Sequence, residues 1–201
     1  FPLMFYLVLS SGINNFAKLQ VVTKNIADVS LIDTTNSVKF QRNISVVCFL
    51  GEDIEGIKGA IFNLNQKIYK PFYGFKNFQV IAIYPNNKIV EVKELQKEVG
   101  AFTDMVKWKF VVSSKAEIAA LYDSFKTDEP LNNLQSTKAF IIDKEVNLRG
   151  RIDDEDFEDG VLFGYDMNSV AILKDKMKDD VKVLLAEYRL ALKKNDADRE
   201  I

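Results

Sequence analysis

Two short and almost continuously apolar runs constrain the fold of this chain more than any other feature. The first run, residues 44–50, is ISVVCFL, and the second, residues 78–84, is FQVIAIY. Strands of this length and apolarity are typical of a parallel sheet that is covered on both faces. Between the runs, apolar residues recur at spacings of three and four, which is the pattern of one helical stripe: Ile54, Ile57, Ile61, Leu64 and Ile68. The spacing therefore predicts a strand, a covering helix that Pro71 ends, and a second parallel strand.

The same alternation continues toward the C-terminus. A short strand and turn are predicted at 28–35, and further strands at 107–112, 139–142, 147–152 and 161–164. Further helices are predicted at 92–102, 115–125 and 168–194. Ser114 and Glu117 form the Ser-x-x-Glu pattern of a capping box at the start of one of these helices. The last strands form a hairpin, which adds antiparallel strands to the sheet.

This order of elements predicts an α/β fold with a mixed central sheet, helices on both faces and a long C-terminal helix. It is similar to the thioredoxin-like fold in its peroxiredoxin and SCO variants. We expect one domain over residues 19–194, an apolar segment over 1–18 and a polar tail over 195–201. Residues 1–9, FPLMFYLVL, are too short to span a bilayer alone. They are either an added strand or the end of a membrane anchor.

Composition excludes several chemistries. The chain has one Cys and no His, which removes His-based catalysis, intramolecular Cys-pair redox cycles and Cys/His zinc sites. The net charge is −2, and no cluster of Lys and Arg predicts nucleic-acid binding. We therefore expect no cofactor, no metal site and no nucleic-acid partner.

Three phrases of the sequence resemble the SCO/SenC family, thioredoxin-like proteins that assist copper insertion into cytochrome oxidase. These phrases are VSLID at 29–33, ISVVCFL at 44–50 and AFIID at 139–143. The family holds copper with a Cys-x-x-x-Cys motif and a distant His. The resemblance places these three groups at Ile54, Lys58 and Gln135, and none of the three can supply a thiolate or an imidazole. The resemblance thus implies the scaffold without its copper or redox site.

Charged residues occupy the loop where that site would lie. Glu52, Asp53 and Lys58 could bind a ligand or a partner beside Ile54 and Gln135. Alternatively, Asp53 caps the following helix and Glu52 stabilises its positive end, each contributing about 0.5–1 kcal/mol.

Two other features have alternative interpretations. Cys48 is either a reactive thiol or a small apolar residue inside a buried strand; its place in an apolar run favours the second. The acidic residues between 153 and 159 form either a cation-binding loop or a solvated hairpin loop. The spacing of an EF-hand fails there, because Asp159 stands where glycine is required. Arg149 and Arg151 could bind an anion, but pairing with this acidic loop is the simpler interpretation.

These observations favour a non-catalytic thioredoxin-like module of the cell envelope, one that binds or helps to assemble a protein partner in or at the membrane, without copper. One alternative is a one-cysteine thiol peroxidase that uses Cys48. Another is a binder of a peptide or small ligand at the cleft near Asp53. The oligomeric state and the partner's identity stay open.

Overall fold

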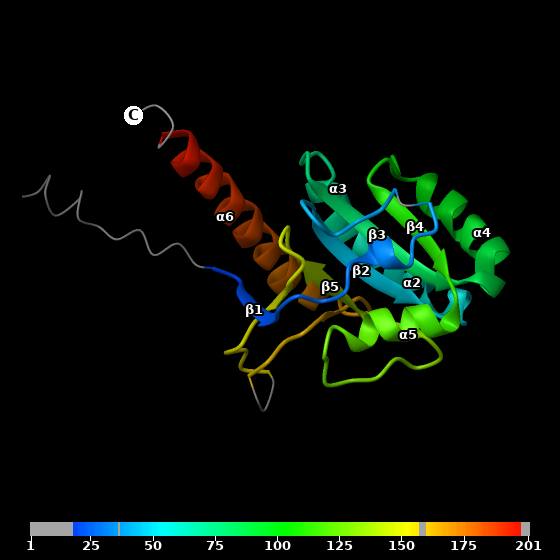
Figure 1. The fold of residues 1–201 in the computed structure, drawn as a ribbon. Helices are drawn as coiled ribbons and strands as arrows, with labels where there is room; N and C mark the ends of the chain where they lie inside the picture. The colour runs from blue at the N-terminus through cyan, green and yellow to red at the C-terminus, as the bar shows by residue number, and fades with distance from the viewer. Residues whose placement is uncertain (1–17, 36, 157–159, 198–201) are drawn as a thin grey trace, which may run out of the picture.

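A mixed sheet lies between two layers of helices in the computed structural model, which describes residues 18–35, 37–156 and 160–197 (Figure 1). The sheet has seven strands in the order β1-β6-β5-β2-β3-β4, and β7 also pairs with β5. Their bounds are β1 Gln20–Thr23, β2 Ile44–Leu50, β3 Phe78–Pro85, β4 Trp108–Ser113, β5 Gln135–Ile142, β6 Leu148–Gly150 and β7 Tyr165–Asp166. The predicted segment 1–9 lies outside the described residues.

Strand β2 is the centre of the sheet, and all seven of its residues are buried. It pairs in parallel with β3, with Ile44 opposite Phe78, and antiparallel with β5, with Cys48 opposite Ala139. Its continuous apolarity follows from this position, because both of its faces are covered.

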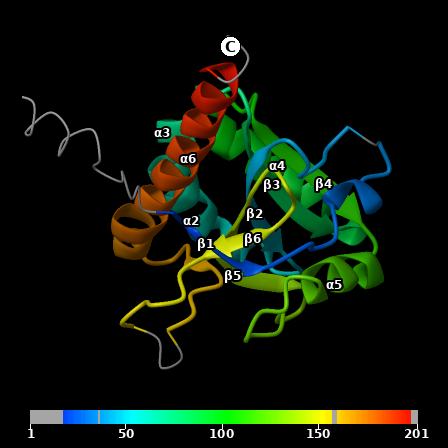
Figure 2. The same cartoon turned by 60° about the vertical axis from the view of Figure 1, so that its left-hand side comes forward.

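Helices cover both faces of the sheet (Figures 1 and 2). They are α2 Ile54–Leu64, α3 Lys70–Phe72, α4 Ile89–Gly100, α5 Lys115–Asp123 and α6 Lys178–Ala197. A π-helical turn, η2 Asn65–Tyr69, joins α2 to α3, and another, η4 Ile172–Met177, precedes α6. Short 3-10 turns are η1 Val29–Leu31 and η3 Asn86–Lys88. The predicted fold class is confirmed.

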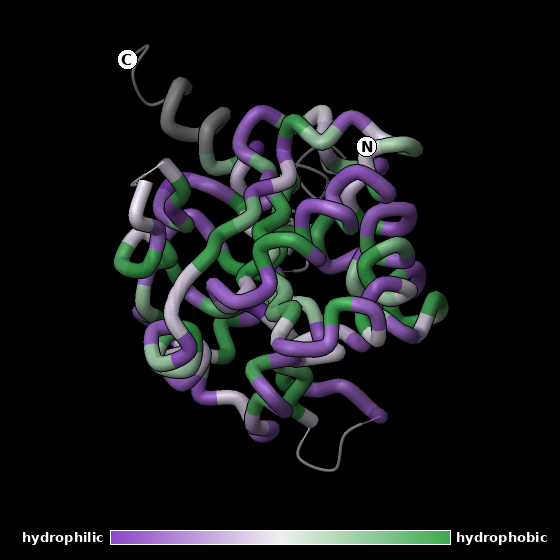
Figure 3. The backbone as a smooth tube through the Cα atoms, turned by 90° about the vertical axis from the view of Figure 1, so that its right-hand side faces the viewer, coloured by the Kyte–Doolittle hydropathy of each residue, from purple (hydrophilic) through white to green (hydrophobic). Residues whose placement is uncertain are grey.

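Two hydrophobic cores lie on opposite faces of the sheet. One core packs α2, α4, η4 and α6 against one face, and the other packs α5 and the segment 26–40 against the opposite face. The second core contains a cluster of edge-to-face aromatic rings, in which Phe49 contacts Tyr122, Phe125 and Phe140. Apolar segments run through the middle of the molecule and hydrophilic ones lie mostly on the outer helices (Figure 3).

A short strand and a turn are predicted at 28–35, and the strand part is wrong: this segment forms η1 and a turn, and the entry strand is β1. The reason is local hydrogen bonding by two carboxylates. Asp28 accepts the backbone N–H groups of Ser30, Phe40 and Gln41, and Asp33 accepts those of Thr35, Ser37 and Val38. Side-chain acceptors that satisfy nearby backbone donors favour turns over strands.

Several element boundaries also differ from prediction. The first helix does not end before Pro71, because the π-helical turn η2 precedes it and α3 continues to Phe72. A wider turn accommodates a proline that has no N–H to donate. The strand predicted at 161–164 is an isolated bridge at Leu162, followed by β7. The last helix continues to Ala197, three residues into the predicted tail.

The acidic loop is not simply solvated. Asp154 is buried, and its Oδ1 accepts from Lys176 Nζ at 2.5 Å. Arg151 binds the carboxylate of Asp180 through two hydrogen bonds of 2.8 and 3.0 Å, and the Tyr165 hydroxyl donates to the same carboxylate at 2.6 Å. The loop is therefore tied to the start of α6, although residues 157–159 lie outside the described part.

Candidate functional site

The site begins at Gly51, where β2 ends and the chain turns toward α2. Gly51 has a φ of +63°, and a Cβ built there would lie 2.4 Å from the Cβ of Gln135. Glycine is therefore required, both for the left-handed backbone and for the close approach of β5. The Gln135 side chain uses this approach: its Nε2 donates to the carbonyl oxygens of Leu50 at 2.7 Å and Asp53 at 2.8 Å. Gln135 thus fastens the loop to the sheet.

Asp53 is the N-cap of α2, because its Oδ1 accepts the backbone N–H of Gly56 at 2.9 Å. The predicted capping role is thus confirmed. The cap places Ile54 in the first turn, where its side chain is buried in the core. Lys58 follows one turn later and points to a neighbouring helix rather than to Gln135: its Nζ lies 2.6 Å from Oε2 of Glu98 on α4.

A cleft of about 270 Å³ opens between the starts of α2 and α4. Four of the five predicted site residues line it, whereas Gln135 lies behind the loop and supports it. The lining residues are Glu52, Asp53, Ile54, Glu55, Lys58, Lys88, Glu91, Glu94, Leu95 and Glu98. Six carboxylates face two lysines, so the cleft is acidic.

Ion pairs hold the walls of the cleft. Glu52 pairs with Lys115 at the start of α5, and the Asn87 amide donates to its other oxygen at 2.9 Å. These hydrogen bonds lower the pKa of Glu52. The hydrogen bond between Lys58 and Glu98 raises the pKa of Lys58. The Glu52 carboxylate therefore stays negative to lower pH, and the Lys58 ammonium stays positive to higher pH.

The sequence did not predict the α4 side of the cleft. Glu91, Glu94 and Glu98 lie there, and their spacing of three and four residues was the available signal, because it places them on one face of a helix. What the spacing could not reveal is that this face lies opposite α2.

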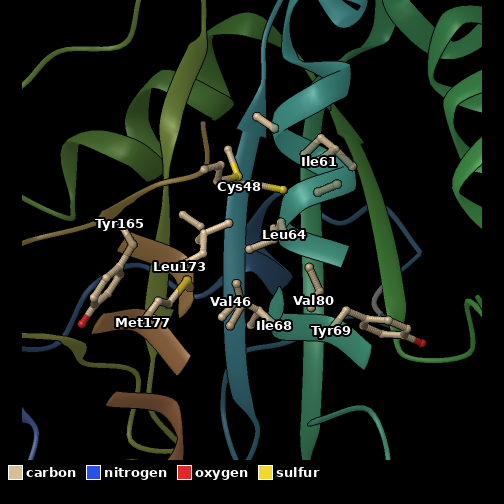
Figure 4. Close-up of a cluster of buried hydrophobic side chains, with 14 of the residues drawn as sticks. Val46, Cys48, Ile61, Leu64, Ile68, Tyr69, Val80, Tyr165, Leu173 and Met177 are labelled. Atoms are coloured by element: carbon tan, nitrogen blue, oxygen red, sulfur yellow. The ribbon is translucent and has the colours of Figure 1, made fainter. Parts of the chain in front are cut away.

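Cys48 is buried inside β2 and not at the cleft, as predicted. Its side chain lies within the core beside Ile61 and Leu64 (Figure 4). The residue is 0% exposed, and its Sγ donates weakly to the carbonyl oxygen of Ile81 at 3.6 Å. Burial raises the pKa of the thiol far above its ordinary value. A thiolate nucleophile needs the opposite environment, with exposure and nearby positive charge.

The described residues contain no group of three or more Cys, Asp or Glu side chains arranged to hold a metal ion. The SCO/SenC resemblance assigns the copper ligands to three positions of this chain. These positions carry the alkyl side chain of Ile54, the ion-paired ammonium of Lys58 and the amide of Gln135. The arrangement offers charge and a shaped cleft, but no group that could cycle electrons or attack a substrate as a thiolate.

Comparison with known proteins identifies the fold. No family model and no curated protein matches the sequence. Among solved structures, the chain is similar to BsSco, a member of the Sco family of cytochrome c oxidase assembly proteins, with a TM-score of 0.54 and 11% identity, over 84% of this chain and 98% of that one. It is also similar to a proposed protein disulfide isomerase from Bacteroides thetaiotaomicron, with a TM-score of 0.52 and 11% identity, over 84% of this chain and 94% of that one. The chain therefore has a thioredoxin-like fold of the kind found in Sco proteins.

Proposed function

We propose that this chain is a non-catalytic thioredoxin-like module that binds a protein partner in the acidic cleft between α2 and α4. The observation that carries the proposal is the combination of a cleft with the residues at it. The cleft lies beside the capped start of α2. At the positions where the resembled family has two thiols and an imidazole, this chain has Ile54, Lys58 and Gln135. The scaffold that would position redox chemistry therefore supports binding instead.

Charge indicates the chemistry of the partner. Six carboxylates against two lysines favour a partner segment that carries Lys or Arg side chains. Glu55 and Glu91 stand at the mouth with side chains that are 86% and 45% exposed, so a partner can reach them. A location in the cell envelope, with a partner at the membrane, is part of the proposal and follows from the resemblance to SCO/SenC proteins. Within the described part of the chain, no helix is long and apolar enough to cross a bilayer.

The alternative of a one-cysteine peroxidase has less support. A peroxide molecule would have to reach Cys48 through the core that separates it from solvent, and the raised thiol pKa opposes formation of the reactive thiolate.

The test has a chemical arm and a binding arm. In the first, the full chain is assayed for reduction of a disulfide substrate and for Cu(I) binding; we expect neither, and stoichiometric Cu(I) binding at micromolar affinity or better would refute the non-catalytic assignment. In the second, a photo-crosslinking amino acid replaces Glu55 at the cleft or Lys126 on a distant exposed loop, and crosslinks are collected in the cells of origin. We expect a discrete protein adduct from position 55 only.

A charge variant makes the binding arm specific. Glu91→Lys with Glu94→Lys should abolish the adduct at position 55, because both reverse the charge of the cleft wall. Asp123→Lys with Asp128→Lys, outside the cleft, should leave it intact. Adducts that persist in the first variant would place the partner elsewhere.

A further inference from the structure

A second surface, at the opposite end of the sheet from the cleft, combines cations with exposed aromatic rings. It centres on the turn between α3 and β3, where the sequence reads KPFYGFK from Lys70 to Lys76. Tyr73 is 42% exposed and Phe75 is 45% exposed. No acidic residue occurs between Glu55 and Glu91, so the charge of this turn is entirely positive.

The loop between α4 and β4 extends this surface. The Tyr69 hydroxyl donates to the carbonyl oxygen of Asp104 at 2.7 Å and accepts the backbone N–H of Lys107 at 3.0 Å. The Lys107 ammonium in turn donates to the carbonyl oxygen of Lys76 at 2.7 Å. These bonds fix the loop against the turn and bring Val106, which is 57% exposed, to the same surface.

Helix α6 borders the turn on its other side. A hollow of about 250 Å³ lies between them, with an apolar floor and two cations at its rim: Phe72, Phe75, Leu185, Ala186, Lys182 and Arg189. Lys182 pairs with Asp179 at 2.7 Å. Among the described residues, Arg189 has no ion-pair partner, and neither Lys70 nor Lys76 has one. A hollow of this kind suits an anionic group attached to an apolar chain.

The two ends of the sheet carry opposite charge. The basic turn leads into β3 at Phe78, which pairs with Ile44 at the start of β2, whereas the acidic cleft follows the end of β2 at Leu50. Seven strand residues separate these ends, a distance of about 23 Å. On the turn and the adjoining loop together, Asp104 is the one acidic residue. The molecule therefore has an acidic pole and a basic, aromatic pole.

We propose that the basic pole, defined by Lys70, Tyr73, Phe75, Lys76, Lys107 and Arg189, docks on the surface of an anionic phospholipid bilayer. Lys and Arg side chains are attracted to anionic lipid head groups. Tyr73 suits the boundary between head groups and acyl chains, because its ring is apolar and its hydroxyl is polar. Phe75 has no polar group and would place its ring on the acyl-chain side of that boundary. Exposed rings among uncompensated lysines meet both conditions. Docked in this way, the acidic cleft faces away from the bilayer. The inference does not depend on the function proposed for the cleft.

The experiment measures sedimentation of the full chain with vesicles of phosphatidylcholine alone or with phosphatidylglycerol added. We expect preferential binding to the anionic vesicles and weaker binding at high salt. Lys70→Gln with Lys76→Gln should lower the partition coefficient on anionic vesicles about 25-fold, or about fivefold for each cation. Tyr73→Ser with Phe75→Ser should weaken binding to both vesicle types.

A matched control uses two exposed lysines outside the basic pole that, like Lys70 and Lys76, form no ion pair with the described residues. This control, Lys93→Gln with Lys126→Gln, should bind like the wild type. Every variant retains residues 1–17, so any lipid affinity of that apolar segment is common to all and the differences report on the basic pole. Equal binding of the wild type to neutral and anionic vesicles would overturn the proposal. So would an equal loss in the control, or selective binding to duplex DNA with no binding to vesicles. Because Lys70 and Lys76 form no ion pair with the described residues, the charge variant keeps the test valid if the aromatic variant unfolds.

Discussion

The guanidinium Nη2 of Arg149 lies 2.6 Å from Oε2 of Glu187, and this ion pair joins strand β6 to the C-terminal helix α6. The Nη1 of the same group lies 3.0 Å from the buried carboxylate of Asp143, and its Nε donates to the carbonyl oxygen of Leu19 at 2.9 Å. One side chain thus connects the hairpin, the residue before the first strand and the last helix. The sequence had suggested that Arg149 pairs with the acidic loop; that expectation is wrong, because α6 and the β5–β6 turn supply nearer carboxylates.

Removing the Arg149 guanidinium should destabilise the folded state. We expect Arg149→Met to lower the free energy of unfolding by about 3–5 kcal/mol, because the carboxylate of Asp143, only 1% exposed, would lose its ion-pair partner. Urea denaturation of the purified chain measures this. Lys182→Met, which breaks an exposed pair with Asp179, should cost less than about 1 kcal/mol. Similar losses in the two variants would contradict the role assigned to Arg149.

Gln135 should matter to the loop at the cleft although it does not line the cleft. Gln135→Leu leaves the carbonyl oxygens of Leu50 and Asp53 without their amide donor, which should destabilise the fold by about 1–2 kcal/mol. Hydrogen exchange should show faster exchange at residues 51–56, and not in β4. As a control, Gln20→Ala at an exposed position should change stability by less than about 0.5 kcal/mol.

Cys48 should be inert in the native protein. We expect no reaction with Ellman's reagent and no sulfenic acid after peroxide treatment until the chain is unfolded in guanidinium, because the thiol is buried and its pKa is raised. Mass spectrometry of intact protein reports both modifications. Rapid oxidation of the native chain would revive the peroxidase alternative.

Stability should fall at alkaline pH. Burial raises the pKa of Cys48 above its ordinary 9.0 and that of Tyr165 well above its ordinary 10.0. The folded state therefore retains protons that the unfolded state releases, so this stabilisation is complete below pH 9 and is lost as pH rises. Each group contributes a slope of about 1.4 kcal/mol per pH unit.

The cysteine can be separated from the tyrosine in that pH profile. Cys48→Ala should move the pH at which the free energy of unfolding begins to fall from about 9 to about 10. Above pH 10 the slope should be smaller by the contribution of one group, about 1.4 kcal/mol per pH unit. Guanidinium denaturation at half-unit steps between pH 7 and 11 measures the onset. An identical onset in wild type and variant would show that Cys48 titrates normally in the folded chain.

Periodicity determined the framework in advance. The apolar runs at 44–50 and 78–84 predicted the central strands, because a strand that is buried on both faces is apolar throughout. The stripe from Ile54 to Ile68 predicted a covering helix, because only one face of that helix is buried. The capping box at Ser114 predicted a helix start, because its side chains satisfy the first helical N–H groups. Each of these requirements leaves a local pattern in the sequence. The same locality explains the error at 28–35, where apolar content suggested a strand and two carboxylates imposed turns.

The sequence by itself also established that histidine is absent and that the single cysteine lies in an apolar strand, which removed the chemistry of the resembled family. Only the tertiary structure decided which residues meet. Three such contacts are the pairing of Lys58 with the acidic wall on α4, the hydrogen bonds of Gln135 to the loop, and the contact of Lys107 with the aromatic turn. They join residues 31 to 85 positions apart in the sequence. Such contacts depend on how the layers pack, and packing leaves no periodic signal in the chain.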